Sequence, residues 1–365
     1  MSKKKILFMV QVPPPVHGAA LRNLSLVESK LLRENFDIKL LSLAFAESIE
    51  DIGKVSGSKL LKALKYAVKL VGTLISFKPA VAYFTLTPAG GAFYRDCLFV
   101  LILKIFRIRI VYHLRGLGIN AARKKNFLNR LLYGFAFSNT NVVCLSKKHL
   151  EDIEGLRYKD HFVVPNGIRV EMKPELLSPN GSDDKKILFL SNFVRSKGVY
   201  EFLEAVRVLK LQGTRFKATL VGADYDVTLN DIQAYIDKYD LNDRVSVKGP
   251  LYKEEKFKMI ANCDIFVFPT YYTFELFPGV ILEAMQCSKP VISTYHGVIE
   301  DIVDDGVTGL LVKTQNVEQL VEKINYLINT PEEAKALGRR AFEKFHHCYT
   351  LDKFEQNMKS VFEKV

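Results

Sequence analysis

Short apolar runs recur along the chain at intervals that suit buried parallel strands. In the first half they cover residues 6–12, 38–43, 81–85, 108–113 and 142–145. Between these runs, apolar residues recur every three or four positions, which indicates helices. The segment 19–33 is expected to form one such helix, with Gly18 at its start. Strands that alternate with helices predict a doubly wound parallel sheet of Rossmann type.

The second half of the chain repeats this alternation. Its expected strands lie at 186–191, 216–221, 244–248, 264–268, 290–293 and 310–312. A last helical pattern runs over 351–362. The segment 174–186 is rich in proline, glycine, asparagine, serine and aspartate, which is typical of a surface linker. We therefore expect an α/β protein with Rossmann-like domains at 1–175 and 186–348, followed by a C-terminal segment at 349–365.

Composition supports a globular protein of two domains. The chain has 365 residues, of which 48% are hydrophobic and 25% are charged, and this length suits two domains better than one. Its five cysteines are odd in number and widely spaced, so neither a disulfide framework nor a zinc site is expected, and the setting is expected to be reducing and cytoplasmic. The apolar start of the chain is too short for a signal-peptide core.

Positive charge is concentrated in the first half. Residues 1–150 hold 24 Lys and Arg against 7 Asp and Glu, a net charge of +17, whereas the remaining 215 residues carry −5. Within this half, Lys59, Lys62, Lys65 and Lys69 recur at helical spacing among leucines. Such a basic amphipathic helix either rests on an anionic membrane or is an ordinary solvated helix face. The longest uninterrupted apolar run, 97–103, is far shorter than the roughly 20 residues that span a bilayer.

The most informative stretch is 274–292, FELFPGVILEAMQCSKPVI. It places Glu275 in a loop after an expected strand and Glu283 about one turn into the helix that begins near Pro278. Ligands of open α/β sheets bind at such strand ends. The helix N-terminus can bind phosphate, and the carboxylate one turn further can accept hydrogen bonds from ribose hydroxyls. The pattern thus favours a nucleotide diphosphate, the alternative being two solvated glutamates. The fingerprint G-x-G-x-x-G is absent from the first loop, which disfavours a nicotinamide dehydrogenase.

This stretch also resembles the signature of a known family. The pattern E-x-F-P-x-V-x-L-E-A-M is formed by Glu275, Phe277, Pro278, Val280, Leu282, Glu283, Ala284 and Met285. It resembles the signature of retaining glycosyltransferases of family 4, which commonly have glycine where this chain has Leu276. The resemblance implies the GT-B fold, with two Rossmann-like domains facing across a cleft and a C-terminal helix, 349–365, that returns to the N-terminal domain.

Further segments extend the resemblance over the whole chain. Residues 162–168, FVVPNGI, resemble the family's V-x-P-N-G segment, and 308–312, TGLLV, resemble its closing strand. Lys197 and Gly198 match the R-x4-K-G element, whose arginine and lysine neutralise the donor diphosphate. Asn192 stands where that arginine is usual. Either Arg195 replaces its charge, or phosphate binding rests on Lys197 and helix N–H groups alone.

The resemblance also implies roles for individual residues. Glu275 is expected to orient the sugar hydroxyls and Glu283 to bind the ribose. His113, at the end of an apolar strand, either contacts the donor sugar or is a structural histidine. Arg115 and the basic cluster Arg123, Lys124 and Lys125 either hold an acceptor phosphate or are solvated surface. The expected catalytic residues are Glu275 and His113. The expected acceptor or membrane face consists of Lys59, Lys62, Lys65, Lys69 and Arg115. The implied donor-binding residues are Gly18, Asn192, Arg195, Lys197, Gly249, Leu251, Phe277, Pro278, Gly279, Val280 and Glu283.

Taken together, these features predict a retaining, metal-independent glycosyltransferase of hexosyltransferase type that needs no cofactor. It is expected to move a sugar from a UDP- or GDP-linked donor to a hydroxyl of a glycan or lipid-linked acceptor, in polysaccharide or glycolipid assembly. The predicted location is the cytoplasm, at the inner face of an anionic membrane, with no nucleic-acid partner. Two alternatives stay open: a nucleotide-sugar epimerase of the same fold, and a catalytically silent membrane-associated adaptor.

Overall fold

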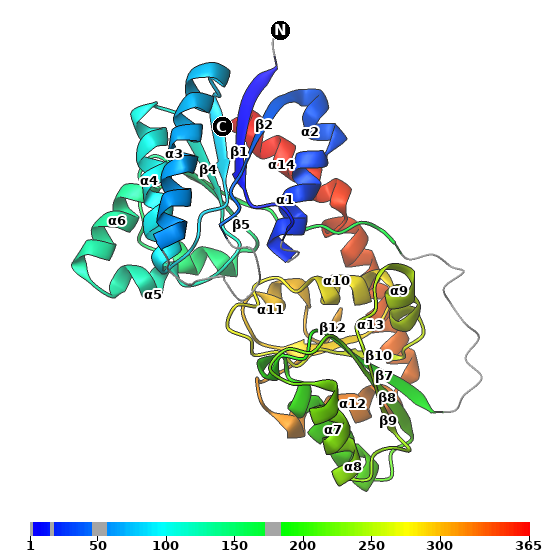
Figure 1. The fold of residues 1–365 in the computed structure, drawn as a ribbon. Coiled ribbons are helices and arrows are strands. Elements are labelled where there is room, and N and C mark those ends of the chain that lie inside the picture. Colours follow the sequence, from blue (N-terminus) through cyan, green and yellow to red (C-terminus); the bar gives the residue numbers. More distant parts are fainter. Residues whose placement is uncertain (1–2, 15–17, 46–56, 172–183) are drawn as a thin grey trace. The chain divides into compact units, whose positions relative to one another are not determined.

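The computed structural model describes residues 3–14, 18–45, 57–171 and 184–365, without the side chains of 57–60 (Figure 1). The chain divides into two compact units. The first contains Met1–Gly167 and Asp352–Val365, and the second contains Ile168–Leu351. Most of the expected linker, 174–186, lies outside the described residues.

The first unit contains one sheet of six parallel strands in the order β2-β1-β3-β4-β5-β6. These strands are β1 (Lys4–Val10), β2 (Phe36–Ser42), β3 (Val81–Phe84), β4 (Arg109–His113), β5 (Asn141–Cys144) and β6 (Asp160–Val163). Residues 6–10 of β1 are buried on both faces, as expected for a sheet covered by helices on both sides. β6 is not among the expected strands, because it lies at the sheet edge and its residues are mostly exposed, so it lacks an apolar run.

Two helical layers cover this sheet. One contains α3 (Gly57–Phe77), α4 (Gly91–Ile105) and α6 (Phe127–Phe137), with α5 (Ile119–Lys124) and the short helix η2 (Lys148–Ile153) beside them. The other contains α1 (Gly18–Glu28), α2 (Lys30–Asn35) and α14 (Leu351–Lys364). The Phe362 ring of α14 packs against the rings of Phe8 and Tyr83 at 5.7 and 5.6 Å between centroids. The prediction that the C-terminal helix returns to the first unit is confirmed.

The expected single helix at 19–33 is wrong, because the structure has two helices there. Ser29 separates α1 from α2: its Oγ accepts a hydrogen bond from the Leu32 N–H at 3.2 Å and donates to Glu355 Oε2 of α14 at 2.6 Å. The apolar spacing continues through this break, so the pattern does not reveal it. The N-cap and its long-range partner determine where the chain changes direction.

The second unit repeats the plan with six parallel strands in the order β12-β11-β10-β7-β8-β9. These strands are β7 (Lys185–Leu190), β8 (Phe216–Val221), β9 (Val245–Lys248), β10 (Ile265–Val267), β11 (Val291–Thr294) and β12 (Gly309–Val312). Its helices are η4 (Arg195–Lys197), α7 (Val199–Leu211), α8 (Leu229–Lys238), α9 (Lys253–Ala261), α10 (Gly279–Gln286), α11 (Ile299–Ile302), α12 (Val317–Asn329) and α13 (Pro331–Cys348). The two parallel sheets with their helices confirm the predicted α/β class and the Rossmann-like repeat. No helix among the described residues is long and apolar enough to cross a membrane.

Candidate donor site and its counterpart in the first unit

The loop that carries Glu275, residues 268–278, is held on one side by the loop between β7 and α7. The Tyr271 N–H donates to the Ser196 carbonyl at 2.7 Å. Gly198 has a φ of +87°, and a Cβ at this position would collide with the Pro269 carbonyl oxygen. Only glycine lets the two loops approach this closely. The Gly198 of the recognised element therefore brings Lys197 beside the Glu275 loop.

The same loop is held on its other side by the turn after β11. His296 Nε2 lies 2.8 Å from the Tyr272 carbonyl oxygen. Gly297 has a φ of +58°, and a Cβ there would lie 2.7 Å from the Glu275 carbonyl oxygen. Leu276, which stands where the family commonly has glycine, is buried at 3% exposure. Backbone contacts on both sides and this buried side chain fix the loop without using the Glu275 carboxylate.

Glu275 and Lys197 form an ion pair at the centre of this arrangement. The distance from Lys197 Nζ to Glu275 Oε2 is 3.5 Å, and the two side chains are 20% and 15% exposed, respectively. The Lys197 ammonium also lies 5.6 Å from the ring centroid of Tyr272. The structure therefore brings together the residue expected to bind the diphosphate and the residue expected to orient the sugar.

Helix α10 supplies the second part of the site. It begins at Gly279 with Pro278 as N-cap, and no side chain of the described residues caps it. The first-turn N–H groups of such a helix start can bind an anion. Glu283 lies in the second turn and pairs with Lys256 of α9, with 2.6 Å between Lys256 Nζ and Glu283 Oε1. Sequence reasoning missed Lys256, because it is 27 residues away in a strongly charged helix that resembles solvated surface.

The remaining expected donor-binding residues surround this core less closely. Gly249 follows β9 with open space where a Cβ would lie, and Leu251 is half-buried. The Phe277 ring meets Tyr349 edge-on at 5.9 Å, and Val280 is half-buried in the first turn of α10. Asn192 is exposed.

Arg195 is exposed, and its guanidinium stacks on the Tyr200 ring at 4.6 Å from the centroid. Its backbone N–H donates to Asp226 Oδ1 at 2.8 Å. The Arg195 side chain therefore packs on α7.

In the first unit, the expected catalytic residue His113 ends β4 and is completely buried. Its Nδ1 lies 2.7 Å from the Tyr83 hydroxyl and 3.4 Å from Arg115 Nη2. Burial, together with the charges of Arg115 and His149, holds the pKa of His113 well below its ordinary value. The ring is therefore neutral near pH 7 and can serve as a hydrogen-bonding group rather than as a cation.

Three buried polar atoms near the strand ends of the first sheet lack hydrogen-bond partners among the described residues. They are Nε2 of His113, Nε of Arg115, and Nε2 of Gln11, the residue directly after β1. Buried polar groups are usually paired, so such atoms indicate where a ligand hydroxyl or water would bind. Sequence reasoning missed Gln11, although its position one residue after the first strand could have indicated it.

Arg115 belongs to this group rather than to the lysines of α3. Its Nη1 donates to Asn166 Oδ1 at 2.7 Å, and its guanidinium lies 5.9 Å from the centroid of Phe354. Asn166 comes from the recognised P-N-G segment, so the structure joins two features that are 51 residues apart in the sequence.

The other expected residues of the first unit lie on its surface. Gly18 is exposed and begins α1. Lys65 and Lys69 are exposed and Lys62 is half-buried, whereas the side chain of Lys59 lies outside the described part of α3. Arg123 donates to the carbonyl oxygens of Glu154 and Gly155, both at 2.8 Å, so it holds the loop after η2.

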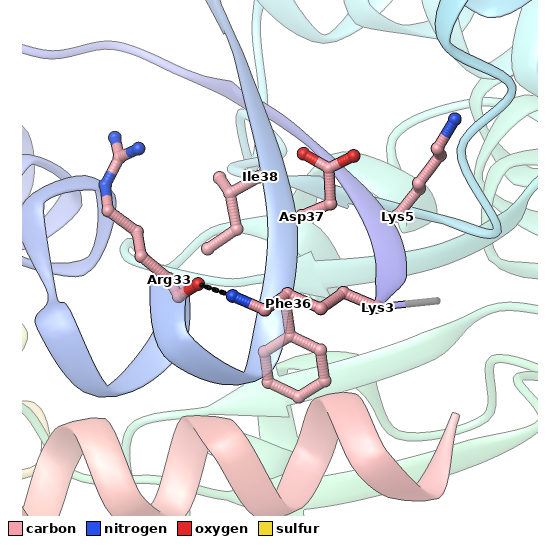
Figure 2. A pocket seen from close by; sticks show the side chains of 6 residues that line it. All are labelled: Lys3, Lys5, Arg33, Phe36, Asp37 and Ile38. Carbon is pink, nitrogen blue, oxygen red and sulfur yellow. Dashed lines mark hydrogen bonds between the residues drawn. The ribbon is translucent and has the colours of Figure 1, made fainter. Parts of the chain in front are cut away.

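A hollow at the opposite end of the first sheet is not part of this site. Figure 2 shows it beside the amino ends of β1 and β2, with the Lys3 ammonium donating to the Arg33 carbonyl at 2.9 Å. Ligands of open α/β sheets bind at the carboxyl ends of strands. The full lining consists of Lys3, Lys5, Arg33, Phe36, Asp37 and Ile38.

Comparisons with known proteins agree with this fold. Residues 173–344 match the family described as "Glycosyl transferases group 1". An uncharacterized glycosyltransferase of Methanocaldococcus jannaschii is 29% identical over 243 residues, which cover 66% of this chain and 65% of that protein. The N,N'-diacetylbacillosaminyl-diphospho-undecaprenol alpha-1,3-N-acetylgalactosaminyltransferase of Campylobacter jejuni is 30% identical over 264 residues, 71% of this chain and 64% of that protein. The chain thus spans slightly less than two thirds of the length of these relatives.

A solved structure shares the fold over the whole chain. HepE from Anabaena, determined in complex with UDP, superposes with a TM-score of 0.76 at 20% identity and covers 99% of this chain and 100% of that one. The similarity supports the architecture of two Rossmann-like units that the two six-stranded sheets show.

Proposed function

Because residues 173–344 match the glycosyl transferases group 1 and the chain has the GT-B fold, we propose that it transfers a sugar from a nucleotide diphosphate sugar to an acceptor hydroxyl. The observation that carries the proposal is the Lys197–Glu275 pair, held by glycine-dependent loop contacts near the start of α10, which no described side chain caps. A cation and helix N–H groups suit a diphosphate, and a fixed carboxylate suits sugar hydroxyls. We infer an acceptor that is a glycan or is lipid-linked, as the name of the Campylobacter relative indicates for that protein.

The proposed donor is linked to UDP or GDP. Its diphosphate would contact Lys197 and the first turn of α10, and its ribose hydroxyls would donate to Glu283, which Lys256 holds at 2.6 Å. The loop of Gly249 and Leu251 would border the base. Binding of the diphosphate would weaken the Lys197–Glu275 pair and leave the Glu275 carboxylate available to the sugar hydroxyls.

We propose that transfer retains the anomeric configuration. The bond between the anomeric carbon and the diphosphate oxygen breaks, and its electron pair stays on the leaving phosphate. The acceptor oxygen bonds to that carbon on the same face, and its proton passes to the phosphate. Lys197 and the N–H groups of α10 stabilise the growing negative charge, so the proposal requires neither a metal ion nor a cofactor. His113, neutral in its buried setting, is assigned a hydrogen bond to the sugar.

The proposed place of action is the cytoplasmic face of an anionic membrane. Lys65 and Lys69 are exposed on α3, and attraction to an anionic leaflet is worth about 1 kcal/mol for each basic residue near it. Changing Lys59, Lys62, Lys65 and Lys69 to Gln should weaken sedimentation with anionic vesicles at low salt. Equal sedimentation of both proteins with anionic and neutral vesicles would assign the lysines another role.

A donor screen tests the proposed activity. UDP- and GDP-sugars are incubated with glycan and diphospholipid-linked acceptors, and released nucleotide diphosphate and the product's anomeric configuration are measured, with and without a chelator. Acceptor-dependent release that the chelator does not reduce, with retention, is expected. Sugar isomers formed without an acceptor would instead indicate an epimerase. Failure to bind any nucleotide sugar by calorimetry would indicate an adaptor.

A further inference from the structure

The outer surface of one helical layer in the first unit is unusually apolar. Helix α4 packs beside both α3 and α6 in this layer (Figure 1). Of the 25 exposed large hydrophobic side chains among the described residues, 11 come from these three helices, whereas the helices of the second unit contribute only Leu211 and Tyr326. We call these 11 side chains the platform: Leu61, Leu64, Val68, Ile75, Tyr94, Leu101, Ile105, Phe127, Leu128, Leu131 and Phe135.

Helical spacing places the platform residues of each helix in one outward stripe. On α4, Tyr94, Leu101 and Ile105 follow each other at seven and four positions, while Phe99 and Leu103 of the same helix are buried in the core. This helix is therefore apolar on both its inner and its outer side. A surface helix normally has a polar outer side, and a helix that is apolar all round requires a second cover.

Hydrogen bonds at both ends fix α4 and α6 against each other. The Tyr94 hydroxyl donates to Asn129 Oδ1 at 2.7 Å. At the other end, Lys104 Nζ donates to the Ser138 carbonyl at 2.7 Å and lies 4.7 Å from the centroid of the Phe135 ring. The apolar stripes of these two helices are therefore parts of one surface, because the two helices are fixed against each other.

The start of α6 is one of the most exposed parts of the platform. Phe127 is 74% exposed and Leu128 is 61% exposed, and only Asn126 separates them from the exposed pair Lys124 and Lys125. Aromatic and aliphatic side chains beside lysines are typical of segments that enter the boundary between headgroups and acyl chains.

Charge on the three helices of the platform and in the segments between them is almost entirely positive. Residues 57–150 hold 16 Lys and Arg but a single acidic residue, Asp96. Asp96 is buried and paired with Arg95 at 2.6 Å, so it presents no negative charge to the surface. On α3 the lysines border the platform on the side of Ala44, which lines a hollow together with Lys62, Lys65 and Lys69. The platform therefore has an apolar centre with basic residues along its edges.

We propose that the platform is inserted into the surface layer of an anionic lipid bilayer, with its apolar stripes below the headgroups and its basic edge on the phosphates. Apolar burial and attraction to anionic headgroups then act together. A second copy of this chain fits less well, because two surfaces of the same positive charge would face each other. A nucleic acid would leave the apolar centre in contact with water or phosphate. The inference rests on the proposed membrane-associated function, and it adds the surface and the mode of contact.

Single tryptophan reporters test insertion directly. The chain contains no tryptophan, so Phe127→Trp in the full-length protein introduces one fluorophore into the platform, and Leu211→Trp introduces a matched one in the second unit. Both proteins are mixed with phosphatidylglycerol-containing vesicles whose acyl chains carry bromine. We expect a blue shift and strong quenching for Phe127→Trp and neither for Leu211→Trp. Equal quenching of the two proteins, or no quenching of either, would overturn the proposal.

Vesicle flotation separates insertion from charge attraction. Phe127→Ser, Leu128→Ser and Leu131→Ser are combined, with Leu211→Ser and Tyr326→Ser combined as control. We expect the platform variant to partition at least about tenfold more weakly, because three large apolar side chains are lost, and to detach in high salt while the control stays bound. Wild-type partitioning of the platform variant would contradict insertion. If the wild type and the control variant form dimers in lipid-free solution and the platform variant does not, the surface is instead assigned to a second copy of the chain.

The two proposals fail in different ways. Release of nucleotide diphosphate with a water-soluble acceptor reports on transfer alone, and the platform variant should keep this activity. Quenching of Phe127→Trp without any transferase activity would leave the platform proposal standing and remove the proposed function. Normal transferase activity without quenching of Phe127→Trp would leave the proposed function standing and remove the platform proposal.

Discussion

The two sheets have the same repeating arrangement of strands and helices, but the candidate residues at their strand ends differ in charge. In the second unit, the candidate residues form ion pairs, Lys197 with Glu275 and Lys256 with Glu283. In the first unit, His113 is buried, neutral and bound to the Tyr83 hydroxyl. Paired charges that can exchange partners suit an ionic ligand such as a diphosphate, whereas a neutral buried group suits hydroxyls. The comparison teaches that the strand ends of the second unit suit an ionic ligand, whereas the buried His113 of the first unit suits uncharged hydrogen bonding.

The largest expected effect concerns Glu275. Glu275→Ala should lower kcat on the order of 10²-fold, because the group that orients the sugar hydroxyls is lost while the loop stays fixed by its backbone contacts. Initial rates of nucleotide diphosphate release measure the effect, and circular dichroism checks the fold. Glu255→Ala, an exposed acid on α9, is the matched control. Wild-type turnover in Glu275→Ala would remove the central role of this loop.

The next effect concerns Lys197. Lys197→Ala should lower kcat by roughly 10-fold or more and weaken donor binding less, because phosphate charge grows as the glycosidic bond breaks. Donor titrations at saturating acceptor separate kcat from KM, and Lys313→Ala, an exposed lysine after β12, is the control. An unchanged kcat would show that the diphosphate is held elsewhere.

A smaller effect is expected for Lys256, which acts through Glu283. Lys256→Met should raise the KM for the donor by about 10-fold with little change in kcat, because a charge-assisted contact that positions a ground-state ligand is lost. Lys258→Met, on the exposed side of the same helix, serves as the control. A fall in kcat at unchanged KM would place Lys256 in the reaction rather than in positioning.

Sequence patterns predicted the fold more completely than the site. Eleven strands were expected within two residues of their observed ends, because strands buried on both faces produce apolar runs. The Glu275 loop and α10 were located because their residues are adjacent in the chain. The sequence did not reveal Lys256, Gln11 or the contact of Gly297 with Glu275, because these depend on neighbours that only the fold brings together. Complete burial of His113 was not foreseen for the same reason.

The smallest expected effect concerns acid stability in the first unit. Burial lowers the pKa of His113 and of His149 below the ordinary value of 6.5, so below that pH the unfolded chain takes up protons that the folded chain does not. The free energy of unfolding should therefore fall as pH decreases from 6.5, by about 1.4 kcal/mol per pH unit for each histidine within the affected range. Above pH 6.5 these groups contribute no slope. Urea unfolding from pH 5 to 8 should show a shallower slope for His113→Gln, and an equal slope would contradict the neutral state assigned to His113.

Calorimetric titration of UDP and GDP into the wild type, Glu283→Ala and His113→Ala tests most directly whether nucleotide binding belongs to the second unit. UDP and GDP lack the transferred sugar of the donor, so they should contact only the residues assigned to the diphosphate and the ribose. We predict that Glu283→Ala weakens binding by about 10-fold, as expected for lost hydrogen bonds to a charged group, and that His113→Ala binds like the wild type. Equal weakening by both substitutions, or wild-type binding by Glu283→Ala, would contradict this division of the donor site.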